Sequence, residues 1–153
     1  VSRVGGNAQI KAMKKVAGSL RIDMAQFREL EAFAQFGTEL DTATQRQLDR
    51  GVRIVEILKQ GQYETMSVDE QVMVIFAATQ GCLDGLEVSE IRSWETGFLE
   101  YMSAQEAEVG QAIRDEGVIS EKTEEALRKA IEFYGNIFGS GEGESEVAEA
   151  ESA

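Results

Sequence analysis

The 153-residue sequence has no proline, where average usage would place roughly eight. Proline interrupts helices, because it lacks an N–H donor and its ring clashes with the preceding turn. Its complete absence therefore favours long helices over a loop-rich β fold. A chain of this length can bury roughly 70% of its unfolded surface, so its core requires neither a disulfide nor a metal.

An apolar stripe with helical spacing runs through the first part of the chain. Gly18 interrupts the stripe, and we expect a kink or a break between two helices there. Gly37 follows the stripe and is expected to end it as a C-cap. The members of the stripe recur at intervals of three and four residues: Met13, Val16, Leu20, Met24, Phe27, Leu30 and Ala34.

Cap and stop signals predict where the later helices begin and end. Thr42 with Gln45, and Ser67 with Glu70, have the spacing of capping boxes. Gly61 is expected to stop the helix between them. The apolar run at residues 72–76 is expected to be buried helix, because it lies between a cap and a glycine at helical length.

Taken together, the signals predict an all-α fold class. The architecture is an irregular helical bundle of six or seven helices, with a disordered acidic C-terminal tail from residue 139. One later stripe places an acid among apolar residues: Val88, Ile91, Glu95, Phe98 and Met102.

The rarest residue types exclude several kinds of active site. The chain has no histidine and a single cysteine, Cys82. It therefore lacks Ser-His and Cys-His pairs, HExxH sites and cysteine clusters for zinc or iron–sulfur, and no metal site is predicted. The stretch at 4–7 lacks the spacing of a phosphate loop and is expected to be a turn. The neighbouring acids Asp69 and Glu70 are expected on a solvated face, because adjacent helical positions do not face each other.

Charge is distributed unevenly along the chain. Residues 1–36 carry a net charge of +3, residues 37–138 of −11 and residues 139–153 of −5. No nucleic-acid partner is expected, because phosphate contacts need clustered Lys and Arg. No apolar run approaches the roughly 18–20 residues of a membrane span. The acidic tail is interpreted as disordered, with docking to a basic partner as the alternative.

Two surface features each keep two interpretations. The lysines at 11–15 form either a solvated basic face or a contact with an acidic neighbouring protein. Phe33, Phe36 and Leu40 either close the core beside a turn or present a binding edge. On composition and periodicity alone, the chain is an acidic helical domain without a self-contained active site.

Dense motifs follow one another along residues 1 to about 138. They are VSRVGG at 1–6, AMKKVAG at 12–18, AQFREL at 25–30, AFAQFG at 32–37, LKQGQY at 58–63 and G-x-LD at 81–84. In this order they resemble the alpha subunit of the rotary, F-type proton-translocating ATP synthase.

The resemblance implies that the chain is the C-terminal part of that subunit. Residues 1–7 would end a nucleotide-binding domain, residues 8–138 would form the helical bundle, and residues 139–153 the tail. The implied function is a structural and regulatory part of the catalytic head, which makes ATP from ADP and phosphate using the proton gradient. The isolated chain is expected to be inactive. A stand-alone acidic helical interaction module is the alternative.

The resemblance also implies partners and a location. The partners are the beta subunits, the other alpha subunits and the gamma shaft, and the membrane is contacted only through the membrane sector of the complex. The location is peripheral on the energy-transducing membrane, at the cytoplasmic face of a bacterial plasma membrane. ATP or ADP with Mg²⁺ would bind the complete subunit, and none is expected to bind this chain tightly.

Seven residues receive roles by motif. Arg3 matches the arginine that the alpha subunit offers across the interface to the beta catalytic site. Gln60 and Gln62 match residues that approach the adenine in alpha's own non-catalytic site. The segment from Phe36 to Asp41 matches the one that faces the shaft near its tip. Its residues expected to contact the shaft are Phe36, Thr38, Glu39 and Asp41. The chain departs from the family at Glu64-Thr65, where a proline is often found, and at Cys82, where an aromatic residue is common.

Overall fold

The computed structural model describes residues 2–35 and 40–139. Within these ranges every regular element is helical, which confirms the predicted all-α class and the upper of the two predicted helix numbers. The predicted disorder of the tail stays a prediction, because residues 140–153 lie outside the described part. The elements are α1 (Ser2–Ala8), α2 (Lys11–Ala34), α3 (Thr42–Ile57), α4 (Val68–Thr79), the 3₁₀ helix η1 (Val88–Glu90), α5 (Ile91–Gln105), α6 (Ala107–Glu116) and α7 (Glu121–Gly139).

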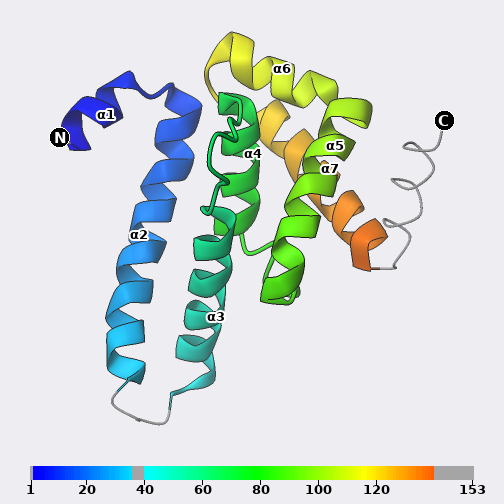
Figure 1. Cartoon of the computed structure of the whole chain (residues 1–153). Coiled ribbons are helices and arrows are strands. Elements are labelled where there is room, and N and C mark those ends of the chain that lie inside the picture. The colour runs from blue at the N-terminus through cyan, green and yellow to red at the C-terminus, as the bar shows by residue number, and fades with distance from the viewer. Residues whose placement is uncertain (1, 36–39, 140–153) are drawn as a thin grey trace.

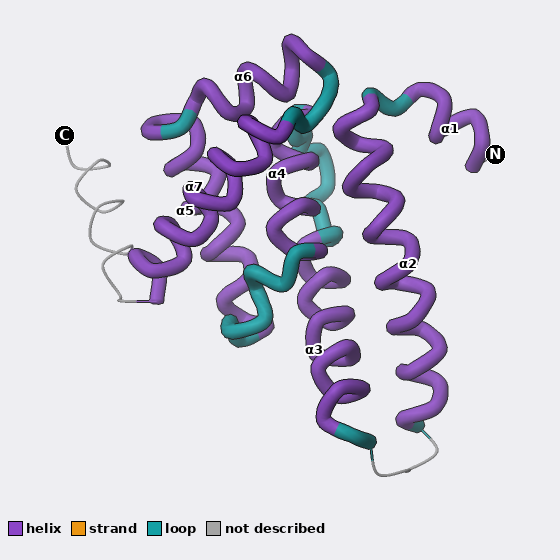
Figure 2. Tube along the Cα trace, turned by 180° about the vertical axis from the view of Figure 1, so that it is seen from behind, coloured by secondary structure: helices purple, strands orange, loops and turns teal. Residues whose placement is uncertain are grey.

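The helices are arranged as a long hairpin joined to a cluster (Figures 1 and 2). α2 and α3 run antiparallel, and the last turn of α2 and the first turn of α3 lie at the end of the hairpin away from the other helices. α4 joins the two parts, since it packs against α2 and α3 on one side and against α6 and α7 on the other. α1 projects from the start of α2, at the end of α2 that lies away from the start of α3 (Figure 1).

The core is centred on α4 and α5. A helix that is apolar on nearly every side must be enclosed by other helices. Residues 72–76 lie within α4 and four of the five are buried, which confirms the prediction of buried helix there. Trp94 and Phe98 of α5 stack with ring centroids 4.7 Å apart, and Tyr134 of α7 lies edge-on to Trp94 at 5.9 Å. The most buried apolar residues of α4 have relative exposures of 3% or less: Val72, Met73, Val74, Phe76, Ala77 and Ala78.

Two glycines in the hairpin have opposite surroundings. Gly18 does not break α2, which continues through it as one helix, so the predicted break between two helices is wrong. No atom outside the local helix lies within 4 Å of where a Cβ would be at Gly18. At Gly51 of α3, a Cβ would lie 2.1 Å from the ring of Phe27, which is buried on α2. Gly51 therefore sets the close approach of the two helices.

One cap prediction is confirmed and one is wrong. Glu70 Oε2 accepts hydrogen bonds from the Ser67 backbone N–H and hydroxyl, both at 2.7 Å, at the start of α4. The cap of α3 is Asp41 rather than Thr42, because Asp41 Oδ1 accepts a hydrogen bond from the Thr44 backbone N–H at 2.7 Å.

Two further sequence predictions are wrong. Residues 4–7 lie within α1 instead of forming a turn. Asp69 is not solvated: it is 2% exposed and pairs with Arg114 of α6, with Nη1 2.5 Å from Oδ2. Gly110 leaves room for this carboxylate, since a Cβ there would lie 2.8 Å from Asp69 Oδ2. The α4–α6 contact thus turns one acid of the adjacent pair inward.

Candidate functional site

The connection between α3 and α4 contains a tight turn at residues 61–64. α3 ends at Ile57, earlier than the expected stop at Gly61. The backbone N–H of Glu64 donates to the carbonyl of Gly61 at 3.2 Å and closes the turn. Tyr63, at the third position, has φ of 68° and its side chain is 93% exposed. Turns of this kind usually carry glycine or asparagine at that position, because a side chain there is strained.

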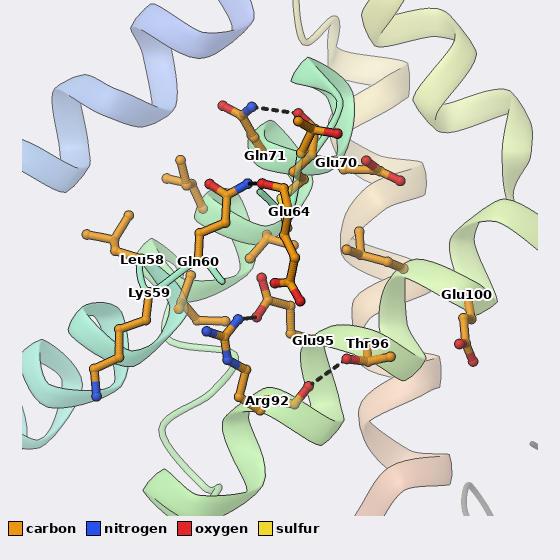
Figure 3. Close-up of a pocket in the computed structure, with 16 residues that line it drawn as sticks. Leu58, Lys59, Gln60, Glu64, Glu70, Gln71, Arg92, Glu95, Thr96 and Glu100 are labelled. Atoms are coloured by element: carbon orange, nitrogen blue, oxygen red, sulfur yellow. Dashed lines mark hydrogen bonds and ion pairs between the residues drawn. The ribbon is translucent and has the colours of Figure 1, made fainter. Parts of the chain in front are cut away.

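The two predicted adenine-contacting residues flank Gly61 but face differently. Gln60 Nε2 donates to the backbone carbonyl of Glu64 at 2.5 Å (Figure 3). This leaves the amide oxygen of Gln60 and one of its two N–H groups for another partner. Gln62 occupies the second position of the turn, and its side chain is exposed. The structure brings the two amides to one turn without directing both into one cavity.

A pocket of about 490 Å³ lies beside this turn, between the 58–66 segment, α4 and α5 (Figure 3). Its size is in the range of ligand pockets. Gln60 and Glu64 line it, whereas Gln62 is not among its described lining residues. Its apolar walls include Ile57, Met66, Val74, Ile75 and Leu99, and its polar lining includes Gln71, Arg92, Glu95 and Thr96.

Glu95 is the buried charge of this pocket. It is 4% exposed, and its Oε2 accepts a hydrogen bond from Arg92 Nη1 at 3.3 Å. Burial raises the pKa of Glu95; Arg92 offsets part of this rise, and the charge of Glu64 adds to it. The carboxylates of Glu64 and Glu95 point toward each other in Figure 3. The pocket therefore holds two facing acids and one guanidinium.

The other predicted site residues lie in separate places. Arg3 belongs to α1, at the projecting N-terminal end of the molecule. Asp41 caps the start of α3, and hydrogen bonds from Thr44 hold the pKa of its carboxyl below the usual range. The 16 residues of α3 separate Asp41 from Gln60 by about 24 Å along the helix axis. Phe36, Thr38 and Glu39 lie outside the described residues.

Two of the open interpretations can be compared with the structure. Lys15 forms an ion pair with Glu124 of α7 at 2.6 Å, so part of the basic face is used within the chain. Phe33 is 53% exposed near the end of α2, which favours a binding edge over a closed core.

Sequence reasoning missed Glu64 and Arg92 as parts of this site. Glu95 had a signal, since it lies on the apolar stripe of α5. The side chain of Glu64 accepts a hydrogen bond from the Gly61 backbone N–H at 3.0 Å. Nothing in the sequence shows this contact, and Glu64 stands out there only as a departure from the family. In the described ranges no cluster of acids or cysteine has the arrangement of a metal site. None of the helices described there is both long and apolar enough to cross a membrane.

Comparison with known proteins gives a consistent result along the chain. A family model described as the ATP synthase alpha/beta chain, C terminal domain, matches residues 9–134. The chain is 54% identical to the ATP synthase subunit alpha of Mycobacterium marinum over 147 residues. It is 53% identical to that of Mycobacterium ulcerans over 147 residues, and 52% identical to that of Clostridium kluyveri over 138 residues. These matches cover 96%, 96% and 90% of this chain but 27% of each relative.

Proposed function

The chain belongs to the family of C-terminal domains of ATP synthase alpha and beta subunits, and from this premise we propose that it serves as the C-terminal helical part of an alpha subunit in a rotary ATP synthase. The observation that carries the proposal is the identity of 54% over 96% of the chain, within 27% of the relative's length. The absence of a phosphate loop from the sequence agrees with a part that depends on partners for catalysis.

In this proposal Arg3 acts in trans on a neighbouring beta subunit. Phosphoryl transfer spreads negative charge over the γ-phosphoryl oxygens, and a positioned guanidinium stabilises that charge. Arginine suits the role because its planar fork reaches two oxygens and stays charged. Support comes from the position of Arg3 in α1, which projects from the bundle (Figure 1). The beta subunit would supply the phosphate loop, the Mg²⁺ site and the residue that orients water.

Gln60 and Gln62 would hold the adenine of a non-catalytic nucleotide. One support is the turn at 61–64, which keeps both amides beside a single glycine. Another is that the bond from Gln60 to the Glu64 carbonyl uses only one N–H of the Gln60 amide. An amide offers two donors and one acceptor, which suits the edge of a purine. The bound species would be ATP or ADP with Mg²⁺.

The segment from Phe36 to Asp41 would face the gamma shaft. Support comes from the end of α2 and the start of α3, which flank this segment in the sequence and lie away from the other helices (Figure 1). The partners of the chain would then be beta subunits at its sides, the shaft at the hairpin tip, and the other alpha subunits through the ring of the head. Its location would be peripheral, at the cytoplasmic face of a bacterial energy-transducing membrane.

A replacement experiment tests the proposal directly. This chain would be joined to the preceding part of the Mycobacterium marinum alpha subunit, in place of that protein's own C-terminal segment. We expect the hybrid subunit to assemble with beta and gamma subunits and to support ATP synthesis in membrane vesicles. A hybrid that folds but never enters the complex would overturn the proposal.

The adenine contact has its own test within such a complex. Replacing Gln60 and Gln62 together with Ala removes hydrogen bonds worth about 1–3 kcal/mol. Occupancy of the non-catalytic nucleotide site should fall, while the rate of the chemical step stays close to that of the parent. Unchanged occupancy in the double variant would count against this role.

A further inference from the structure

The turn at residues 61–64, which includes Gln62 and directly follows Gln60, has a backbone conformation that is unfavourable by itself. The chain has no proline to restrict it, and Tyr63 is the described non-glycine residue with a positive φ, at 68°. A residue held in the left-handed region costs of order 1–3 kcal/mol and persists only where neighbouring contacts fix it. The side chain of Tyr63 is 93% exposed and does not supply those contacts.

Glu64 makes the contacts that hold the turn in this conformation. Its carboxylate Oε2 accepts a hydrogen bond from the Gly61 backbone N–H at 3.0 Å. Its backbone N–H donates to the Gly61 carbonyl at 3.2 Å, and its backbone carbonyl accepts from Gln60 Nε2 at 2.5 Å. All three bonds that close this segment thus end on one residue, and one of them depends on its side chain.

Gly61 leaves the space that the Glu64 carboxylate occupies. A Cβ at position 61 would lie 2.5 Å from Glu64 Cδ and 2.5 Å from its Oε2. Gly61 is not among the glycines with positive φ, so its backbone conformation itself accepts alanine. The cost of a methyl group here is therefore the displacement of Glu64.

We propose that Glu64 is the positioning residue of the Gln60–Gln62 segment, and that its hold on Gly61 sets how well the two amides receive an adenine. The proposal rests on the function proposed above for Gln60 and Gln62. Glu64 acts through the backbone of Gly61 and is not itself assigned to the ligand.

The charges around Glu64 make this hold depend on pH. Glu95 of α5 faces it across the pocket, with Arg92 as its partner. The other charged lining groups are Lys59 beyond α3, Glu70 of α4 and Glu100 of α5. When Glu95 is ionised, it repels the Glu64 carboxylate and weakens the bond to Gly61. Burial raises the pKa of Glu95, so the hold should be firmer on the acid side of that pKa than above it.

The first test uses the chain itself and nuclear magnetic resonance of the Gly61 amide. In the parent chain this amide should be shifted downfield and protected from exchange, more strongly as Glu95 becomes protonated. Glu64→Ala should abolish both signs, and Glu64→Gln should keep them, because its carbonyl still accepts the bond, but without the dependence on pH. Glu95→Gln should also remove that dependence. Glu100→Ala is the matched control, because Glu100 lines the same pocket and its carboxylate accepts no described hydrogen bond.

Gly61→Ala adds a test that leaves every charge in place. The added methyl group should displace the Glu64 carboxylate. The amide at position 61 should then lose its downfield shift and its protection from exchange, as in Glu64→Ala. The double variant should be no worse than either single one, since both remove the same contact. Additive effects of the two changes would show that Glu64 does not act through Gly61 and would overturn the proposal.

The second test measures radiolabelled MgATP retained at the non-catalytic site of complexes that carry this chain. Glu64→Ala should lower retention about three- to tenfold, the range for the loss of one ordinary hydrogen bond, and Glu64→Gln should restore most of it. If the Gln60/Gln62 double variant lowers retention while Glu64→Ala does not, the positioning role is wrong and the adenine contact stands. If neither lowers it, the adenine contact itself is wrong and the positioning role falls with it.

Discussion

Asp69 and Glu95 are the two acidic side chains that the described part of the chain buries. Each pairs with an arginine whose side chain is 45% exposed. Each bridge therefore reaches from the interior to the surface, and the two partners of a bridge are not equivalent. Loss of the exposed arginine leaves a buried charge behind, whereas loss of the acid leaves an arginine that water can reach.

Arg114→Met should lower the free energy of unfolding by about 2–4 kcal/mol, because it leaves the buried carboxylate of Asp69 without its cation. Asp69→Asn should cost less, since Arg114 can turn to solvent. Urea unfolding followed by circular dichroism measures both. Lys129→Met is the control, because its partner Glu125 is 70% exposed, and it should change little. Equal losses in Arg114→Met and Lys129→Met would contradict the burial argument.

Glu95 should make stability fall as pH rises. Its pKa in the folded chain is raised, so the unfolded chain releases the same proton at lower pH. Between the ordinary and the raised pKa the folded state binds more protons, and unfolding becomes easier with increasing pH. Glu95→Gln should remove this part of the decline. Unfolding midpoints of both proteins across pH about 4–8 measure it; parallel profiles would show that Glu95 titrates normally.

The sequence indicates that an acidic side chain is buried when that residue lies on an apolar helical stripe. It gives no such indication when burial depends on an ion-pair partner far away in the chain. Glu95 falls on the apolar stripe of α5, and it is buried as that stripe implies. Asp69 is expected in solvent from its sequence position, because its partner Arg114 is 45 residues away and no local pattern connects them. The same reason hides Glu64, whose bond to Gly61 depends on a turn with a strained Tyr63.

The α2–α3 hairpin shows how a single glycine can fix the distance between two elements. Gly51 faces the ring of Phe27 across the interface, and the Phe27 Cβ would lie 2.8 Å from an added Cβ. The nearest atoms belong to a buried ring close to its own backbone, so they cannot move aside as the tip of a long, flexible side group could. Any side chain at position 51 must therefore separate the helices.

Gly51→Ala should destabilise the protein by about 1–3 kcal/mol, the usual cost of overpacking a core, even though alanine favours a helix. Gly18→Ala is its matched control: the same change, in α2, with no tertiary neighbour within 4 Å. It should stabilise by about 0.5–1 kcal/mol through helix propensity alone. Thermal unfolding of both variants decides the point, and changes of the same sign would refute the role of Gly51.

Element types are predictable because caps, stripes and the lack of proline agree along the chain. The capping box at Ser67 and the buried run at 72–76 are found where expected. The failures occur at glycines, because a glycine in sequence does not show whether it breaks a helix, as expected of Gly18, or admits a neighbour, as Gly51 does. The helix at Ser2–Ala8 escapes prediction for the same reason, since paired glycines suggest a turn.

As a whole molecule, the chain holds its proposed contacts in three separate places. Arg3 lies in the projecting α1, the Gln60–Gln62 turn follows α3, and Asp41 stands at the hairpin end. This spacing suits a part that touches several partners at once. The sequence motifs are enough to indicate the family, but the order of residues along the chain does not show how far apart these groups lie.

The purified chain should hydrolyse no ATP, because this chemistry needs a phosphate loop, which the sequence lacks, and a carboxylate placed against a bound Mg²⁺. A coupled assay for ADP release measures this, with the Arg3→Ala variant as control. Activity above that control would show a catalytic centre within the chain itself, and the proposed dependence on beta subunits would be wrong.

The most direct test of the central claim is the turnover of an assembled complex that carries Arg3→Lys. Lysine keeps the charge but not the planar fork, so nucleotide should still bind while steady-state turnover falls by about 10³–10⁵, the range for an arginine finger. Assembly with beta and gamma subunits would be confirmed on the same sample. A transition-state analogue should lose far more affinity than ATP. Near-normal turnover in the assembled variant would contradict the account.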